Sequence, residues 1–120
     1  MSTWDREIFS DETNADFLDE LVELEPEEIL EAVSDAVLLA NGAGASDEEI
    51  ANGRAAATIA AIWSGAPFSA GDIAESYPFI RSNPGEISEQ IAEAAAALLE
   101  AAAEDGDTEA DVDQFVEALS

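Results

Sequence analysis

The chain has 120 residues and a formal net charge of −26, because 29 Asp and Glu residues face three Arg and no Lys or His. The absence of His, Cys and Lys excludes zinc and haem ligation, Cys-His and Ser-His-Asp catalysis, Schiff-base chemistry and the P-loop phosphate contact. So acidic a chain repels phosphate groups and anionic lipids, so we expect it to bind neither nucleic acid nor a membrane.

Carboxylates are the remaining source of reaction chemistry. Two carboxylates can act as acid and base in glycoside hydrolysis without any His. Among 29 acids, however, a pair at a suitable spacing arises by chance, so this signal singles out no catalytic residue. We therefore expect a protein that is not an enzyme and carries no cofactor.

Alternating acids near the end of the chain suggest a calcium loop: Asp105, Asp107, Glu109, Asp111 and Asp113. An EF-hand loop starting at Asp105 needs Gly at its sixth position and Glu at its twelfth, and these positions hold Ala110 and Val116. We therefore expect no metal site of this kind. A weaker calcium or magnesium site is the alternative to acids that simply favour a helix N-terminus through its dipole.

A hydrophobic content of 48% indicates a chain that folds, and its length fits a single domain over residues 1–120. The longest uncharged run, 55–71, contains Ser64, Gly65 and Pro67 and is too short and too broken to span a bilayer. The first 20 residues are acidic, with one Arg, unlike a signal peptide. We therefore expect a cytoplasmic location.

The first two helices follow from apolar spacing and from Pro26. One helix is expected after a cap at Ser10 or Asp11, and it stops before Pro26. Its apolar stripe consists of Phe17, Leu18, Leu21, Val22 and Leu24. Pro26 suits the first turn of a second helix, which we expect to run to about Ala40. Its inner face is expected to hold Ile29, Val33, Ala36, Val37 and Ala40.

The outer face of that second helix carries Glu27, Glu31 and Asp35 at four-residue spacing. Like charges at this spacing destabilise a helix by a few tenths of a kcal/mol per pair, roughly. We expect packing of the inner face to offset this repulsion.

Residues 41–45 predict a turn, and Ser46 with Glu49 predicts a capping box that opens a third helix ending near Gly65. Between Gly65 and Gly85 the sequence has three Pro and several aromatic residues, which predicts a longer ordered loop. Within this loop, Ser69 and Asp72 suit the start of one short helix to about Ser76.

Two helices are expected after the loop. The first begins at about Glu86 with an apolar face of Ile87, Ile91, Ala94, Ala95, Leu98 and Ala102. The second is indicated by the Thr108 and Asp111 capping pair and by Val112, Phe115, Val116 and Leu119. The pattern as a whole predicts an all-α fold, a compact bundle of about five helices with one longer ordered loop.

The N-terminal pattern Trp4, Ile8 and Phe9, followed by Ala15-Asp16-Phe17, resembles the start of the bacterial domain-of-unknown-function family 4259. The Ala-rich stretch 55–63 and the turn 64–67 also resemble that family, so the likeness covers about the first half of the chain. Members usually have Gly where this chain has Ser2 and Asp5. The resemblance implies no activity and no functional residues, because the family has none assigned.

The aromatic residues around the loop form the candidate recognition surface: Trp63, Phe68, Tyr77, Phe79 and Arg81. A long ordered loop in a small domain often serves binding, although packing of the loop against the bundle is the alternative. The cluster of Trp4, Phe9 and Phe17 is expected to pack the N-terminal arm onto the first helix, and a ligand-binding aromatic pocket is the alternative.

Arginines are scarce enough in this chain that each is expected to pair with an acid. We expect Arg54 to tie two helices together and Arg81 to pin the loop. Gripping a carboxylate ligand is the alternative role for either side chain.

Three functions then compete. The first is a protein-interaction or accessory domain, an inhibitor or regulator, whose acidity directs it to a basic partner. The second is a nucleic-acid mimic, which requires acids aligned as a stripe at phosphate spacing. The third holds that the acidity is only an adaptation to salt or solubility, which the absence of Lys favours and the nine Ile and five Phe disfavour. We expect the first, and the sequence indicates no oligomeric state.

Overall fold

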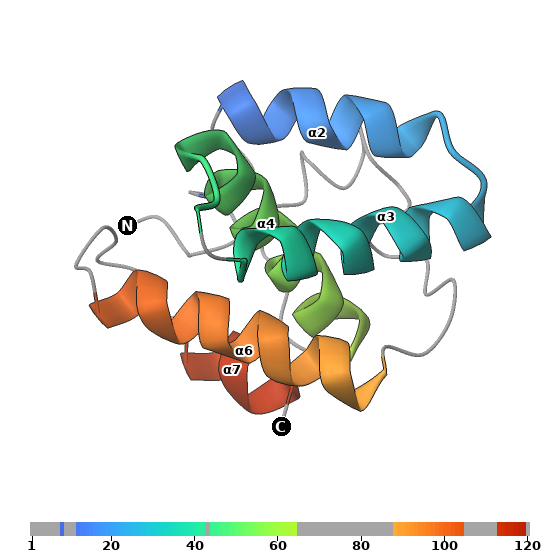
Figure 1. The fold of residues 1–120 in the computed structure, drawn as a ribbon. Helices are drawn as coiled ribbons and strands as arrows, with labels where there is room; N and C mark the ends of the chain where they lie inside the picture. Colours follow the sequence, from blue (N-terminus) through green and yellow to red (C-terminus); the bar gives the residue numbers. More distant parts are fainter. Residues whose placement is uncertain (1–7, 9–11, 43, 65–87, 105–112, 120) are drawn as a thin grey trace.

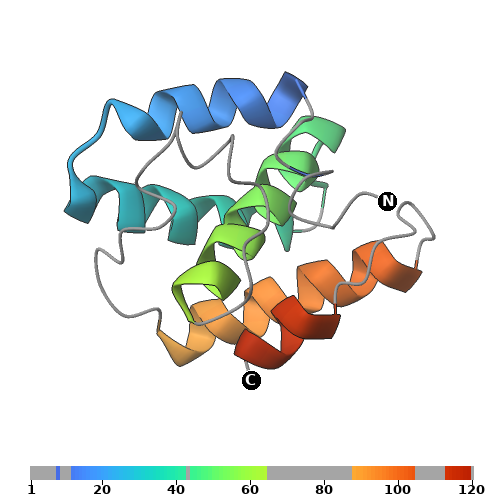
Figure 2. The same cartoon turned by 180° about the vertical axis from the view of Figure 1, so that it is seen from behind.

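The computed structural model describes residues 8, 12–42, 44–64, 88–104 and 113–119. Within these residues it contains no strand and five helices: α2 (Glu12–Val22), α3 (Pro26–Ala40), α4 (Asp47–Trp63), α6 (Glu89–Glu104) and α7 (Asp113–Leu119). Figure 1 shows α2 and α3 as an antiparallel pair on one side of α4, with α6 and α7 on the other. From behind, α4 runs diagonally in front of α3, from beside the start of α2 toward α6 (Figure 2). The expected all-α bundle is confirmed.

Several sequence expectations fall on other residues. The longer loop, its short helix to Ser76, the caps at Ser10 or Asp11, and the Thr108 and Asp111 pair lie outside the described residues.

The starts of α3 and α4 match the sequence signals. Pro26 is the first residue of α3, where its missing N–H leaves no helical hydrogen bond unmade. At α4, the Ser46 Oγ accepts a hydrogen bond from the Glu49 N–H at 3.2 Å, and the Ser46 N–H donates to Glu49 Oε1 at 2.9 Å. This reciprocal pair is the predicted capping box, so the start of α4 is confirmed.

The turn between α3 and α4 also follows its sequence. Gly44 has a φ of +82°, in the left-handed region that a side chain disfavours. Asn41 ends α3, and its Nδ2 donates to the backbone oxygen of Ala94 on α6 at 3.0 Å. The turn is therefore anchored to a helix 53 residues further along the chain.

The start of α6 differs from the prediction. We expected this helix from about Glu86, whereas it begins at Glu89 and Ser88 is not helical. The Ser88 Oγ accepts a hydrogen bond from the Ile91 N–H at 3.3 Å, which satisfies a backbone donor that the helix leaves unpaired. The spacing of apolar residues placed the start of this helix too early in the sequence, because the capping residue Ser88 decides where the helix begins.

The central helix α4 is surrounded by the other four. Every residue from 55 to 61 has no exposed surface. Helices with such all-round burial lie in the interior instead of facing water on one side. The one buried hydroxyl in this stretch, Thr58 Oγ1, donates to the Arg54 carbonyl oxygen at 2.8 Å, so its polar group is satisfied within the helix.

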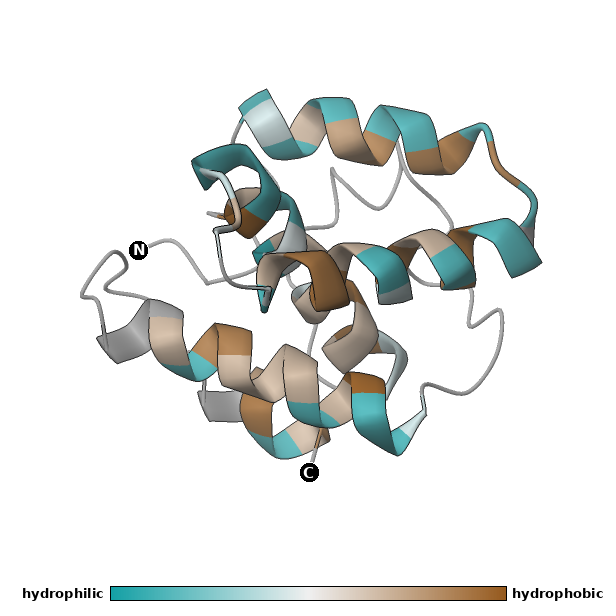
Figure 3. Ribbon diagram, in the orientation of Figure 1, coloured by the Kyte–Doolittle hydropathy of each residue, from teal (hydrophilic) through white to brown (hydrophobic). Residues whose placement is uncertain are grey.

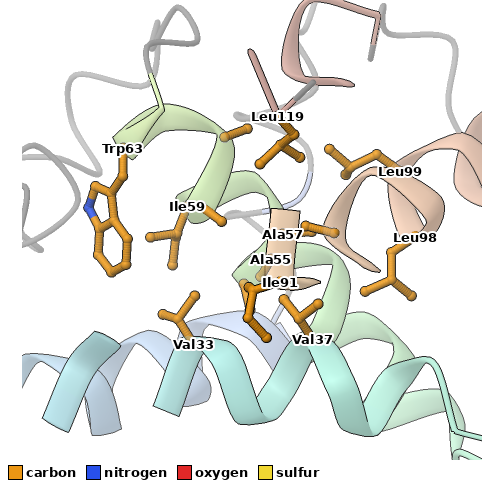
Figure 4. Packing of buried hydrophobic residues seen from close by; sticks show 14 of the residues in the cluster. Val33, Val37, Ala55, Ala57, Ile59, Trp63, Ile91, Leu98, Leu99 and Leu119 are labelled. Atoms are coloured by element: carbon orange, nitrogen blue, oxygen red, sulfur yellow. The ribbon is translucent and has the colours of Figure 1, made fainter. Parts of the chain in front are cut away.

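The outer helices each bury one stripe against α4. The apolar core comprises residues from all five helices (Figure 4): Leu18, Leu21, Ile29, Val33, Val37, Ala40, Ala55, Ala56, Ala57, Ile59, Ala60, Ala61, Trp63, Ile91, Ala95, Leu98, Leu99, Phe115 and Leu119. The inner face predicted for α3 is confirmed at four positions, while Ala36 is half-buried at its edge.

The stripe predicted for α2 is wrong at Val22, whereas Phe17 and Leu24 are half-buried against the core. Val22 is 43% exposed, because the buried row of this helix runs through Asn14, Leu18 and Leu21 and leaves Val22 to one side. Asn14 is fully buried, and its Nδ2 donates to the Ile8 carbonyl oxygen at 2.8 Å. The Asn14 Oδ1 is buried without a hydrogen-bond partner among the described residues.

Gly53 marks the closest approach of three helices. A Cβ added there would overlap the Cβ of Ala40 on α3 and would lie 3.1 Å from the Ala36 carbonyl oxygen and 3.4 Å from Leu98 Cδ1 on α6. A side chain at this position would force α3 and α4 apart.

We predict that Gly53→Ala lowers the free energy of unfolding by about 1–3 kcal/mol through overpacking. This loss exceeds the gain of at most about 1 kcal/mol that Ala brings over Gly in a helix. Urea denaturation followed by circular dichroism measures the change. Adding Ala40→Gly should recover part of the loss in a double-mutant cycle. A Gly53→Ala variant as stable as the parent contradicts the close crossing.

A second prediction concerns Asn14→Asp. At pH 7 the new carboxylate is buried, has lost the donor to the Ile8 carbonyl oxygen and is destabilising. Burial raises the pKa of this carboxyl above its unfolded value, and the protonated form regains a donor. The deficit relative to the parent should therefore shrink as the pH falls from 7 to 5.5, by up to about 1.4 kcal/mol per pH unit. Urea denaturation of both proteins at each pH measures it, and a deficit independent of pH contradicts the buried position.

Candidate functional site

Of the five residues of the recognition surface expected from the sequence, one, Trp63, lies within the described part of the chain. Trp63 is the last residue of α4 and is 8% exposed. Figure 4 shows its ring at the edge of the core, beside Ile59. This burial fits the packing alternative for Trp63. Phe68, Tyr77, Phe79 and Arg81 lie outside the described residues, so their grouping with Trp63 stays a prediction.

Arg54 is the basic residue within the described part of the chain. It is half-buried on α4, nine residues before Trp63, and it takes part in a further interaction besides the bond from Thr58 to its carbonyl oxygen. Its position on the central helix agrees with a role inside the bundle. The expected link between two helices stays a prediction.

Acidic side chains cover the outside of every described helix. Exposed acids occur on all five elements, among them Asp16 on α2, Glu31 on α3, Glu48 on α4, Glu93 on α6 and Glu117 on α7. Figure 3 shows hydrophilic colour on the outer turns of α2, α3 and α6 and at the start of α4. The field outside these helices is therefore negative on several sides at once.

Some of these acids have a structural role. Asp47, Glu48 and Glu49 occupy the first turn of α4, where the partial positive charge of the helix N-terminus stabilises them. Glu27 and Glu28 occupy the same place in α3. Neither Glu31 nor Asp35, further along α3, has this compensation.

The outer face of α3 combines acids with exposed leucines. Six residues of this helix are exposed and fall within an arc of about 120° on a helix of 3.6 residues per turn. We call them the α3 outer face: Glu27, Glu28, Glu31, Asp35, Leu38 and Leu39. Leu38 is 41% exposed and Leu39 is 56% exposed. In Figure 3 the last turn of α3 carries the apolar colour, while its first turn is hydrophilic.

Sequence reasoning did not place Leu38 and Leu39. The stretch 36–40 is an apolar run of five residues, which spans more than one full turn of helix. Such a run must place some members on the outside, since Val37 and Ala40 already face the core. This interruption of the helical spacing of apolar residues was therefore the sequence signal that could have identified the exposed leucines.

The described residues offer no metal centre and no membrane span. Among them, no group of three or more His, Cys, Asp or Glu side chains is arranged to hold a metal ion. The acids 105–112 of the calcium alternative lie outside the described residues. None of the described helices is both long and apolar enough to cross a membrane.

Comparison with known proteins gives a family without an activity. No curated protein and no solved structure matches the chain. One family model matches residues 2–119, which extends the resemblance seen in the first half of the sequence to nearly the whole chain. The protein therefore belongs to the family described as a domain of unknown function, DUF4259.

Proposed function

We propose that the protein is a non-enzymatic interaction or accessory domain that binds a basic protein, as an inhibitor or a regulator would. The observation that carries the proposal is the charge: −26 on the chain, with exposed acids on all five described helices and the described arginine, Arg54, half-buried on the central helix. A field of this sign accelerates encounters with cationic proteins and suppresses encounters with anionic ones.

Two alternatives from the sequence are less well supported. A nucleic-acid mimic would need most of its acids in one stripe at phosphate spacing. The exposed acids of the described residues are instead distributed over every helix, and the row of Glu27, Glu31 and Asp35 on α3 holds three of them. Adaptation to salt accounts for the charge without a partner and makes a separate prediction for stability.

Affinity capture from a lysate of the source cell tests the proposal. We expect a specific basic protein to be retained both at low salt and at about 0.15 M salt, where the Debye length is about 8 Å. The control is an unrelated protein of equal net charge and length. If both baits retain the same proteins, and lose them together as salt rises, the proposed function is wrong. We place this binding in the cytoplasm, and cell fractionation tests that location.

Melting temperature against KCl tests the adaptation alternative. Because the acids repel one another, we expect stabilisation as salt shortens the Debye length from about 30 Å at 0.01 M to about 8 Å at 0.15 M. Above this range the melting temperature should level off. A continued rise into molar KCl, beyond that of a helical control protein of low net charge, would instead favour adaptation to salt.

A further inference from the structure

The α3 outer face carries two leucines that are not part of the buried core. The core of the bundle is built from the opposite side of this helix, through Ile29, Val33 and Val37. Leu38 and Leu39 nevertheless keep large parts of their apolar surface in water. Burying that surface against another molecule would be favourable.

The acids of this face repel one another along the helix. Glu27, Glu31 and Asp35 are exposed and spaced four residues apart, so consecutive members are neighbours on the helix surface. Leu39 continues the same row one turn further on. The row extends over about 18 Å, at 1.5 Å per residue. A molecule with cations at matching intervals would remove this repulsion.

From this combination we propose that the α3 outer face binds a basic amphipathic helix of a partner protein. The Lys or Arg side chains of that helix lie along Glu27, Glu31 and Asp35, and an apolar side chain near one of its ends covers Leu38 and Leu39. The apolar contact at one end of the acidic row sets the direction and register of the bound helix, which charge alone would leave undefined. This inference rests on the proposed function and assigns it a surface and a partner chemistry.

A second copy of the chain fits this face poorly. Two-fold pairing through α3 would bring two acidic rows together, on chains that each carry a net charge of −26. An anionic lipid surface is disfavoured by the same sign of charge. A cationic helix is the occupant that complements both the acids and the leucines.

The test uses a synthetic helical peptide of about five turns with Lys at every fourth position and Leu at one end, since an ordered helix in water needs roughly this length. A second peptide has the same composition in scrambled order. Each is titrated into the ¹⁵N-labelled full chain at about 0.15 M salt, where long-range attraction is screened. We expect chemical-shift changes centred on Glu31, Asp35, Leu38 and Leu39, and weaker binding of the scrambled peptide.

Matched variants identify the face. Glu31→Gln with Asp35→Asn removes two charges from α3, and Asp16→Asn with Glu20→Gln removes the same two kinds of charge from the exposed side of α2. We expect the α3 pair to weaken binding about tenfold, and the α2 pair to change it less than about twofold. Leu39→Ser should also weaken binding, whereas Val22→Ser, at a 43% exposed apolar residue of α2, should not. Because Leu39 is the more exposed leucine, this single change keeps the test valid if a double Leu variant fails to fold.

The outcomes separate the two proposals. Equal losses from the α2 and α3 pairs, or equal binding of the two peptides, overturn the α3 assignment. Self-association in sedimentation experiments that Leu39→Ser abolishes also overturns the α3 assignment, because a second copy of the chain then occupies this face. A basic partner captured from lysate and unaffected by the α3 variants overturns this inference alone. If lysate capture yields no specific basic protein, the proposed function is wrong, and the inference that rests on it is wrong too.

Discussion

Close packing around α4 is the constraint on which the rest of the bundle depends. Seven consecutive residues of this helix, 55–61, have no exposed surface, and five of them are Ala. Short side chains let the neighbouring helices approach on every side, and at Gly53 even a methyl group would overlap α3. Dispersion contacts at such distances are individually weak but numerous, so a core of small residues still stabilises the fold.

This arrangement explains how so acidic a chain folds. Because residues 55–61 of α4 are covered on all sides, α2, α3, α6 and α7 each need only one apolar stripe to complete the core. Their outer faces are left for charge. The acids at helix starts gain from the helix dipole, and the others, such as Glu31 and Asp35, add repulsion that core packing must exceed. A surface of one sign is therefore compatible with a stable interior, and it is the property from which the proposed binding of a basic partner follows.

The parts of this fold that the sequence predicted are those with local chemical signals. Pro26 marked the start of α3, and the Ser46 and Glu49 pair marked the start of α4. Contacts between distant segments had no such signal. Asn14 is buried with a hydrogen bond to Ile8, and the need for Gly at position 53 depends on Ala40 and Leu98, so neither was predictable from spacing. The exposed leucines of α3 belong to the same class, since only the assembled bundle decides which members of an apolar run remain outside.

The all-round burial of α4 divides the protein into two parts with different freedom to change. A substitution within residues 55–61 changes the side-chain volume in a closely packed interior. It therefore disturbs the packing of several helices at once. The acids of the outer faces are exposed, so exchanging one of them for another polar residue leaves the interior intact. For the proposed interaction domain, partner preference can therefore change through surface substitutions while the scaffold stays the same.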